Sequence, residues 1–272
     1  MNVAGYIRTA NASNEMRARA RVTVAEMITN GDLLAYQGRS QSVRASDFGS
    51  CRLALWAEMH DLNDITRDPI DDSLTRLDVG ALMGAWLGAL LEQGANDDGW
   101  DVALEYIPAG GGHIDALIRR RCGGCNEDGE GNGETNGMLC MSCDGAAWSQ
   151  AHVVEFKTGY DTGAPKADSA AHQLQAAKYA LATNAARFTL CYVKVAAPKG
   201  KRIAQFTFDA EPYRELVAQE IKRLESAFGD DAPDPDPLEV WRCYTCRYGA
   251  CSKNKNTAKA DTAARDLEEL FA

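Results

Sequence analysis

The sequence lacks the long hydrophobic segments that membrane-spanning and secreted proteins carry. No run of eighteen apolar residues occurs in the 272-residue chain, so we expect no transmembrane helix. The N-terminus, MNVAGYIRTANASNEMRARAR, has no apolar stretch typical of a signal peptide, so we expect a cytoplasmic protein. An excess of positive charge is also missing. The net charge of −10 argues mildly against nonspecific nucleic-acid binding.

Nine cysteines in a cytoplasmic chain favour metal sites over disulfides. One set of four has the spacing C-x2-C-x14-C-x2-C: Cys122, Cys125, Cys140 and Cys143. Four thiolates at this spacing suit a structural, tetrahedral zinc ion. The glycine-rich loop between the pairs fits a zinc ribbon on the tip of a hairpin. Such a ribbon either contacts DNA or a partner, or only closes a long loop.

Three ionisable residues interrupt two apolar runs. Asp115 lies within HIDALI, whereas Glu155 and Lys157 lie within VVEFK. Residues two apart in a strand share a face, so Glu155 and Lys157 point the same way. Carboxylates on neighbouring strands form an oxygen site that suits Mg²⁺ or Mn²⁺. The alternative is a structural ion pair between Glu155 and Lys157 on a half-exposed strand.

A helix predicted over residues 169–183 follows these strands. It carries Gln175 and Tyr179 four residues apart, on a polar face separate from the stripe of Leu174, Ala177 and Leu181. This polar face either looks back over the strand of Glu155 and Lys157 or is an ordinary exposed helix face.

The order Asp…Glu-x-Lys…Gln-x-x-x-Tyr resembles the PD-(D/E)XK nuclease superfamily over roughly residues 42 to 252. Within it, the chain looks most like the RecB-type branch, which includes CRISPR-associated and phage-borne exonucleases with an iron–sulfur cluster. The resemblance implies an α/β (α+β) fold, a mixed central sheet flanked by helices with a restriction-endonuclease-like core. It also implies a catalytic set consisting of Asp115, Glu155, Lys157, Gln175 and Tyr179.

The resemblance also implies metal ligands. Mg²⁺ or Mn²⁺ would be held by Asp115, Glu155 and the backbone carbonyl of Phe156. Where the family often has a metal-binding His, in a G-x-x-x-H pattern, this chain has Gly84. Glu92, two turns further along, is a candidate for the missing ligand.

A second cysteine set resembles the 4Fe–4S closure of the same branch: Cys51, Cys243, Cys246 and Cys251. Cysteine ligation alone does not separate iron–sulfur from zinc. The cluster would be structural, closing a long loop between the two ends of the chain.

The pattern divides the chain into a helical part (1–95), a nuclease core (96–228, with the zinc insertion at 120–149) and a C-terminal part (229–272) with an acidic, proline-rich linker and three cluster cysteines. Before the core, helices are expected at 12–30, from about Ser46, and at 73–93. In the core, strands are expected at 102–107, 113–120, 151–158, 187–195 and 202–208, followed by a helix at 212–228.

Two functions remain open. The first is a Mg²⁺- or Mn²⁺-dependent DNA exonuclease that acts on single-stranded ends, in recombination, repair or phage DNA processing; a phage-encoded enzyme would work in the host cytoplasm. The second is a DNA-binding protein that keeps the nuclease fold with little or no turnover, which the absence of the His at Gly84 favours. A third, weaker interpretation is a nicking or resolving endonuclease.

Overall fold

A five-stranded mixed sheet forms the centre of the protein. The computed structural model describes residues 1–30, 43–60, 62, 71–108, 112–122, 148–159, 169–194, 197–198, 202–236, 243, 246, 248 and 251. The strands lie in sequence order: β1 (Asp101–Tyr106), β2 (Ile114–Arg121), β3 (Trp148–Gly159), β4 (Arg187–Lys194) and β5 (Ile203–Asp209). All neighbours are antiparallel except β3 and β4, which are parallel. A parallel pair needs a crossover connection, and helix α5 lies in it.

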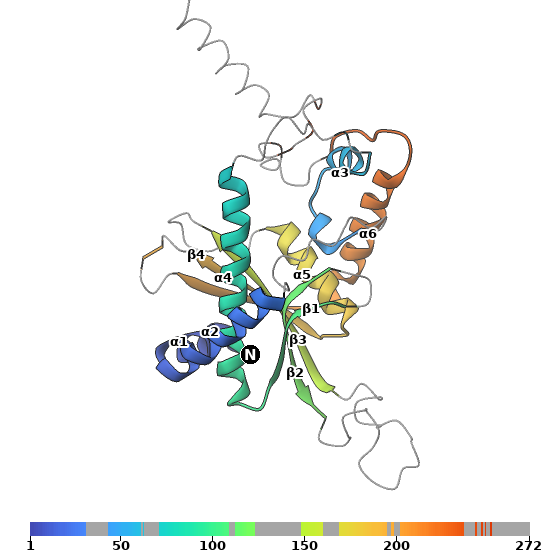
Figure 1. Cartoon of the computed structure of the whole chain (residues 1–272). Helices are drawn as coiled ribbons and strands as arrows, with labels where there is room; N and C mark the ends of the chain where they lie inside the picture. Colours follow the sequence, from blue (N-terminus) through green and yellow to red (C-terminus); the bar gives the residue numbers. More distant parts are fainter. Residues whose placement is uncertain are drawn as a thin grey trace, which may run out of the picture.

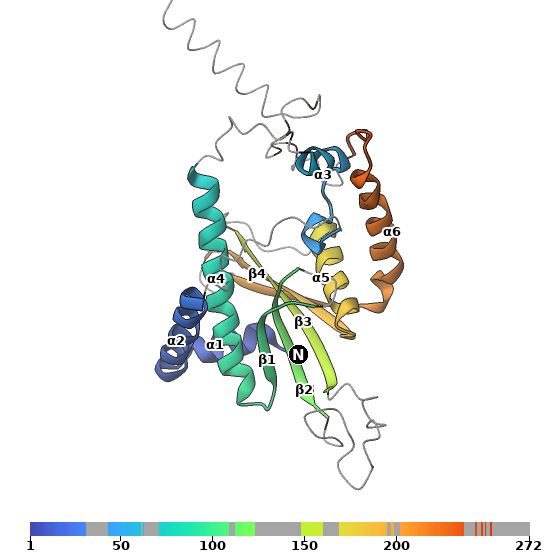
Figure 2. The same ribbon diagram turned by 45° about the vertical axis from the view of Figure 1, so that its right-hand side comes forward.

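Helices cover both faces of this sheet (Figures 1 and 2). The described helices are α1 (Val3–Ala12), α2 (Asn14–Asn30), α3 (Arg52–Met59), α4 (Asp71–Asn96), α5 (Ala170–Ala182) and α6 (Arg214–Glu225), with short 3₁₀ turns at Ala45–Asp47, Glu211–Tyr213 and Ser226–Phe228.

Two hydrophobic cores result, one on each face of the sheet. Side chains alternate along β3, so Val153 packs in the core that includes α3, α5 and α6. Its neighbour Val154 packs in the core that includes α1, α2 and α4. We call these the α5 face and the α4 face. The mixed α/β sandwich agrees with the predicted fold class, and the expected strands are present with bounds shifted by up to three residues.

The N-terminal third differs most from the prediction. A helix was expected from residue 12, but an additional helix, α1, precedes it and buries Val3, Ile7 and Ala10. A helix was also expected from about Ser46, but this segment forms only a 3₁₀ turn. The chain then turns through Gly49, whose φ of +77° favours glycine, and α3 begins at Arg52.

Other predictions fall on parts of the chain that the structure does not describe. The zinc prediction is one of them, because Cys125, Cys140 and Cys143 lie outside the described residues, while Cys122 is buried at the end of β2. Among the described helices, none is long and apolar enough to cross a membrane.

Candidate active site

Strands β2 and β3 separate at the point where the predicted acids lie. Their pairing extends as far as Ala116 opposite Val154, and beyond it β3 continues to Gly159 beside β4. Asp115 and Glu155 are the next residues on each side of this fork. The register therefore brings together two carboxylates that are 40 positions apart in the sequence.

Glu155 is buried with one oxygen unsatisfied. Its side chain is 2% exposed, and its Oε2 accepts a hydrogen bond from Lys157 Nζ at 3.0 Å. Its Oε1 is the single buried side-chain polar atom without a hydrogen-bond partner in the described part of the chain. An orphaned buried acceptor is costly, and a bound cation would satisfy it.

Asp115 is oriented by the backbone of the neighbouring strand. Its Oδ2 accepts a hydrogen bond from the Phe156 amide at 2.6 Å. Burial raises the pKa of Asp115, while the charge of Lys157 and the Phe156 amide act against that rise. The contact of Phe156 with this site is thus made by its backbone N–H. The role of its carbonyl oxygen as a metal ligand stays a prediction.

The two carboxylates repel each other. Burial is the largest cause that raises the pKa of Glu155, and the neighbouring charge of Asp115 is the next. Lys157 offsets part of this effect. Two adjacent carboxylates that resist ionisation, one with an open oxygen, fit a divalent cation, which would neutralise both.

Lys157 is held between the strand and helix α5. Besides Glu155, its Nζ donates to Gln175 Oε1 at 2.9 Å. Helix α5 starts at a defined point because the Ser169 side chain caps it by accepting from the His172 amide. The predicted Gln175 therefore does face the strand of Glu155 and Lys157.

Tyr179 lies deeper than its predicted polar face suggested. It is 3% exposed, and its hydroxyl is hydrogen-bonded to the Gln175 side chain and the His113 backbone. Burial and the charge of Glu155 raise its pKa. Gly112 passes directly over this ring: a Cβ there would lie 2.8 Å from the Tyr179 hydroxyl, and its φ is +91°. The glycine of G-x-x-D is therefore needed for the Gln-x-x-x-Tyr tyrosine to fit.

The structure does not place Glu92 with these residues. Glu92 faces α2, where Thr23 Oγ1 lies 3.5 Å from its Oε2, and burial raises its pKa. One turn before it on α4, Gly88 already faces Leu104 and the backbone of Asp115. Gly84, a further turn back, has no atom of the described residues within 4 Å of the position its Cβ would take.

Sequence reasoning missed one acid close to this site. Glu105 of β1 occupies the register position opposite Asp115, and its charge is among those that raise the pKa of Glu155. Its φ of +47° is unusual for a residue other than glycine. Counting antiparallel register back from the hairpin turn would have paired these two positions.

The predicted cluster cysteines lie near one another. Burial raises the pKa of Cys246 most, and the charges of Cys251, Cys51 and Cys243 raise it further. All four therefore lie within electrostatic range. Among the residues that the structure describes, however, no group of three or more His, Cys, Asp or Glu side chains is arranged around a single metal ion.

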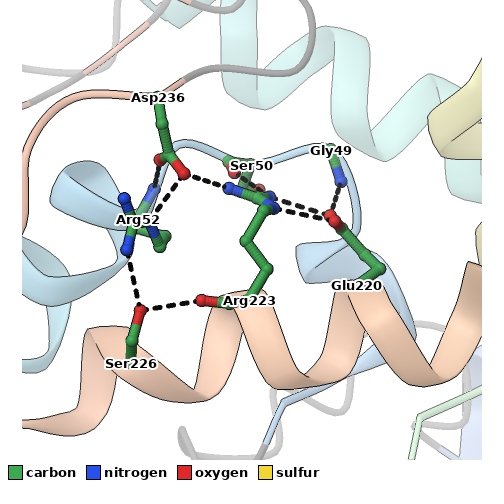
Figure 3. A network of polar contacts seen from close by, with 7 residues as sticks. All are labelled: Gly49, Ser50, Arg52, Glu220, Arg223, Ser226 and Asp236. Carbon is green, nitrogen blue, oxygen red and sulfur yellow. Dashed lines mark hydrogen bonds and ion pairs between the residues drawn. The ribbon is translucent and has the colours of Figure 1, made fainter.

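A polar network holds the segment that contains Cys51 against the C-terminal part (Figure 3). Arg223 of α6 lies between two acids: it donates to both oxygens of Glu220 at 2.8 Å and to Asp236 Oδ2 at 2.7 Å. Arg52 also donates to Asp236, from its backbone N at 2.8 Å and its Nε at 2.6 Å. We call Arg52, Glu220, Arg223 and Asp236 the latch.

Comparison with known proteins bears on the same residues. A family model described as the PD-(D/E)XK nuclease superfamily matches residues 144–251, a range that includes Glu155, Lys157, Gln175 and Tyr179. No curated protein gave a significant sequence match. The crystal structure of SSO0001 is 16% identical, with a TM-score of 0.45 over 85% of this chain and 97% of that chain, a similarity that establishes no shared activity. The matched segment, which is less than half of the chain, forms one side of the fork, and this part of the chain is similar to the PD-(D/E)XK nuclease superfamily.

Proposed function

We propose that the protein is a Mg²⁺- or Mn²⁺-dependent deoxyribonuclease that removes nucleotides from DNA ends. The observation that carries the proposal is Glu155 Oε1, a buried carboxylate oxygen without a partner beside Asp115. A purely structural ion pair between Glu155 and Lys157 would leave this oxygen unexplained. The action on single-stranded ends, and the RecB-type branch, rest on the resemblance of motif order and cysteine spacing.

Each residue of the fork has a role in this chemistry. Asp115 and Glu155 would hold the divalent ion, which when bound polarises the phosphodiester and lowers the pKa of a water molecule. Lys157, fixed by Glu155 and Gln175, orients the attacking water or neutralises charge that develops on the phosphate. Tyr179, held by Gln175 and the His113 backbone, helps to position the phosphate.

The same proposal includes a structural 4Fe–4S cluster on Cys51, Cys243, Cys246 and Cys251. Their mutual electrostatic effect supports one shared centre. Anaerobically purified protein should then contain about four irons per chain.

Lys157→Ala tests the catalytic assignment. Cleavage of end-labelled single-stranded DNA in Mn²⁺ should fall by at least about 100-fold, because an electrostatic group acting at the transition state is lost. Lys222→Ala, at an exposed lysine on α6, is the matched control and should cleave normally. Unchanged cleavage by Lys157→Ala would contradict the mechanism.

The alternative is a DNA-binding protein without turnover. The open space at Gly84, where the resemblance leads one to expect a metal-binding side chain, favours it. Tight binding of single-stranded DNA by the wild-type protein, with no cleavage in either Mg²⁺ or Mn²⁺, would establish this alternative in place of the nuclease.

A further inference from the structure

The latch pins both neighbours of Cys51. Arg223 Nη2 donates to the carbonyl oxygen of Ser50 at 2.8 Å, and the backbone N of Arg52 donates to Asp236 Oδ1 at 2.8 Å. Cys51 lies between these two residues. The position of its backbone is therefore set by side chains of α6 and of the C-terminal part.

The acids of the latch are well satisfied. Glu220 is 7% exposed, and its Oε1 also accepts from the Gly49 amide at 3.0 Å. Asp236 accepts from two arginines and one amide. Although burial alone would raise the pKa of Asp236, these bonds hold it below its ordinary value. A partly buried carboxylate with such donors is a strong anchor.

The latch also fixes where the chain runs after α6. Trp56 Nε1 of α3 donates to the Gly229 carbonyl at 3.1 Å, and Asp236 lies seven residues before Cys243. The contact of Arg52 with Asp236 spans 184 positions and that of Trp56 with Gly229 spans 173, so both join the segment of Cys51 to a distant C-terminal segment. None of them involves a cysteine.

From these contacts we infer that Arg223 and Asp236 are positioning residues that hold Cys51 beside Cys243, Cys246 and Cys251 before any metal binds. The inference rests on the proposed function only in taking these four cysteines as one centre. Ion pairs and hydrogen bonds thus hold the segment of Cys51 against the C-terminal part, and the cluster would bind to a preformed site.

Crosslinking of the metal-free protein tests this directly. Full-length protein stripped with a chelator would be treated with dibromobimane, which bridges neighbouring thiols, and the bridged peptides mapped by mass spectrometry. Wild-type protein should give bridges from Cys51 to a C-terminal cysteine. Arg223→Ala and Asp236→Asn should give them about tenfold more slowly, because at least one charge-assisted hydrogen bond is lost.

Two further variants make the result specific. Arg214→Ala removes the exposed arginine at the start of α6, which pairs with Glu211 of the preceding 3₁₀ turn, also three residues away. This variant should bridge as the wild type does. Arg223→Lys keeps the charge and should restore part of the rate. The absence of Cys51 bridges in the wild type, or equal rates in wild type and Arg223→Ala, would overturn the inference.

Iron analysis separates this inference from the proposed function. In one outcome, bridging depends on Arg223 as expected while the purified protein contains neither iron nor sulfide. That result would contradict the assignment of the iron–sulfur cluster but support the positioning role of Arg223. If both hold, Arg223→Ala should also retain less iron and absorb less near 400 nm, while the unfolding of its sheet stays close to that of Arg214→Ala.

Discussion

Two buried glutamates, Glu155 at the fork and Glu220 in the latch, have nearly the same exposure but opposite surroundings. Glu220 accepts three hydrogen bonds, two from Arg223 and one from the Gly49 amide. Glu155 accepts one from Lys157 and leaves an oxygen unsatisfied. A carboxylate that only stabilises a fold is expected to be fully paired. The contrast is what the proposed role of Glu155 as a metal ligand requires, whereas the full pairing of Glu220 fits a structural role.

Substituting each glutamate by glutamine should separate these roles. Glu155→Gln should lower cleavage by at least about 100-fold, because a metal ligand worth several kcal/mol is lost. At about pH 4, where this carboxyl is protonated in both the folded and the unfolded chain, its metal-free stability should change by less than about 1 kcal/mol. At higher pH the metal-free variant should be more stable than the wild type, because it carries no carboxyl with a raised pKa. Glu220→Gln should leave cleavage within a few-fold but cost about 2–3 kcal/mol in urea unfolding. Equal destabilisation by both substitutions would remove the distinction.

The two regions should also respond to pH in opposite directions. In the metal-free protein, Asp115 and Glu155 keep their protons at pH values where the unfolded chain has released them. Stability should therefore fall as pH rises above the ordinary carboxyl pKa, by up to about 1.4 kcal/mol per pH unit for each group. The pKa of Asp236 is lower in the folded protein than in the unfolded chain. Its carboxylate therefore stabilises the folded protein at pH values above the unfolded-state pKa, and this stabilisation is lost as the pH falls through the folded-state pKa.

Urea unfolding between about pH 2 and pH 8, in a chelator, measures both trends. In Glu155→Gln, the free energy of unfolding should decrease less steeply as the pH rises. In Asp236→Asn, it should decrease less steeply as the pH falls. Saturating Mn²⁺ should reverse the trend at the fork only. An alkaline slope unchanged in Glu155→Gln would show that Glu155 does not carry it.

The smallest effect is expected at the glycines of α4. Gly84→Ala should stabilise the protein by about 0.5–1 kcal/mol, because the new methyl group meets open space and helix propensity improves. Gly94→Ala should destabilise it, since its Cβ would lie 2.6 Å from the Tyr6 carbonyl oxygen. Thermal unfolding of the two variants compares them. Destabilisation by Gly84→Ala would mean that another part of the chain fills this space.

The core around the fork could be predicted because its residues carry local signals. Alternating apolar residues on either side of Glu155 and Lys157 predict the strand, and the spacing of Gln175 and Tyr179 predicts which side of the helix faces it. The structure brings Gln175 to Lys157, as this pattern indicates, whereas the position of Tyr179 beside His113 was not predicted. The fit between Gly112 and Tyr179 has no such signal, because it depends on the packing of a loop against a distant helix.

The errors have both local and long-range causes. The segment at Ser46 has helical residues, but the Asp47 side chain bonds the Arg44 amide and the chain turns at Gly49. Glu92 is at a plausible helical spacing, but the structure places its carboxylate beside Thr23 of α2, and its role as a metal ligand stays a prediction. The latch was invisible in the sequence, because Arg52 and Asp236 are 184 positions apart.

That separation has a consequence for how the chain folds during synthesis. The ribosome releases the strands and helix α5 well before Asp236, so the sheet can form while Arg52 and Arg223 still lack this partner. Contacts between residues this far apart in sequence form late and slow folding, because the chain loses the entropy of closing a long loop before the contacts stabilise the fold. Until residue 236 has emerged, Cys51 would remain exposed to oxidants and to adventitious metals on a nearly finished domain.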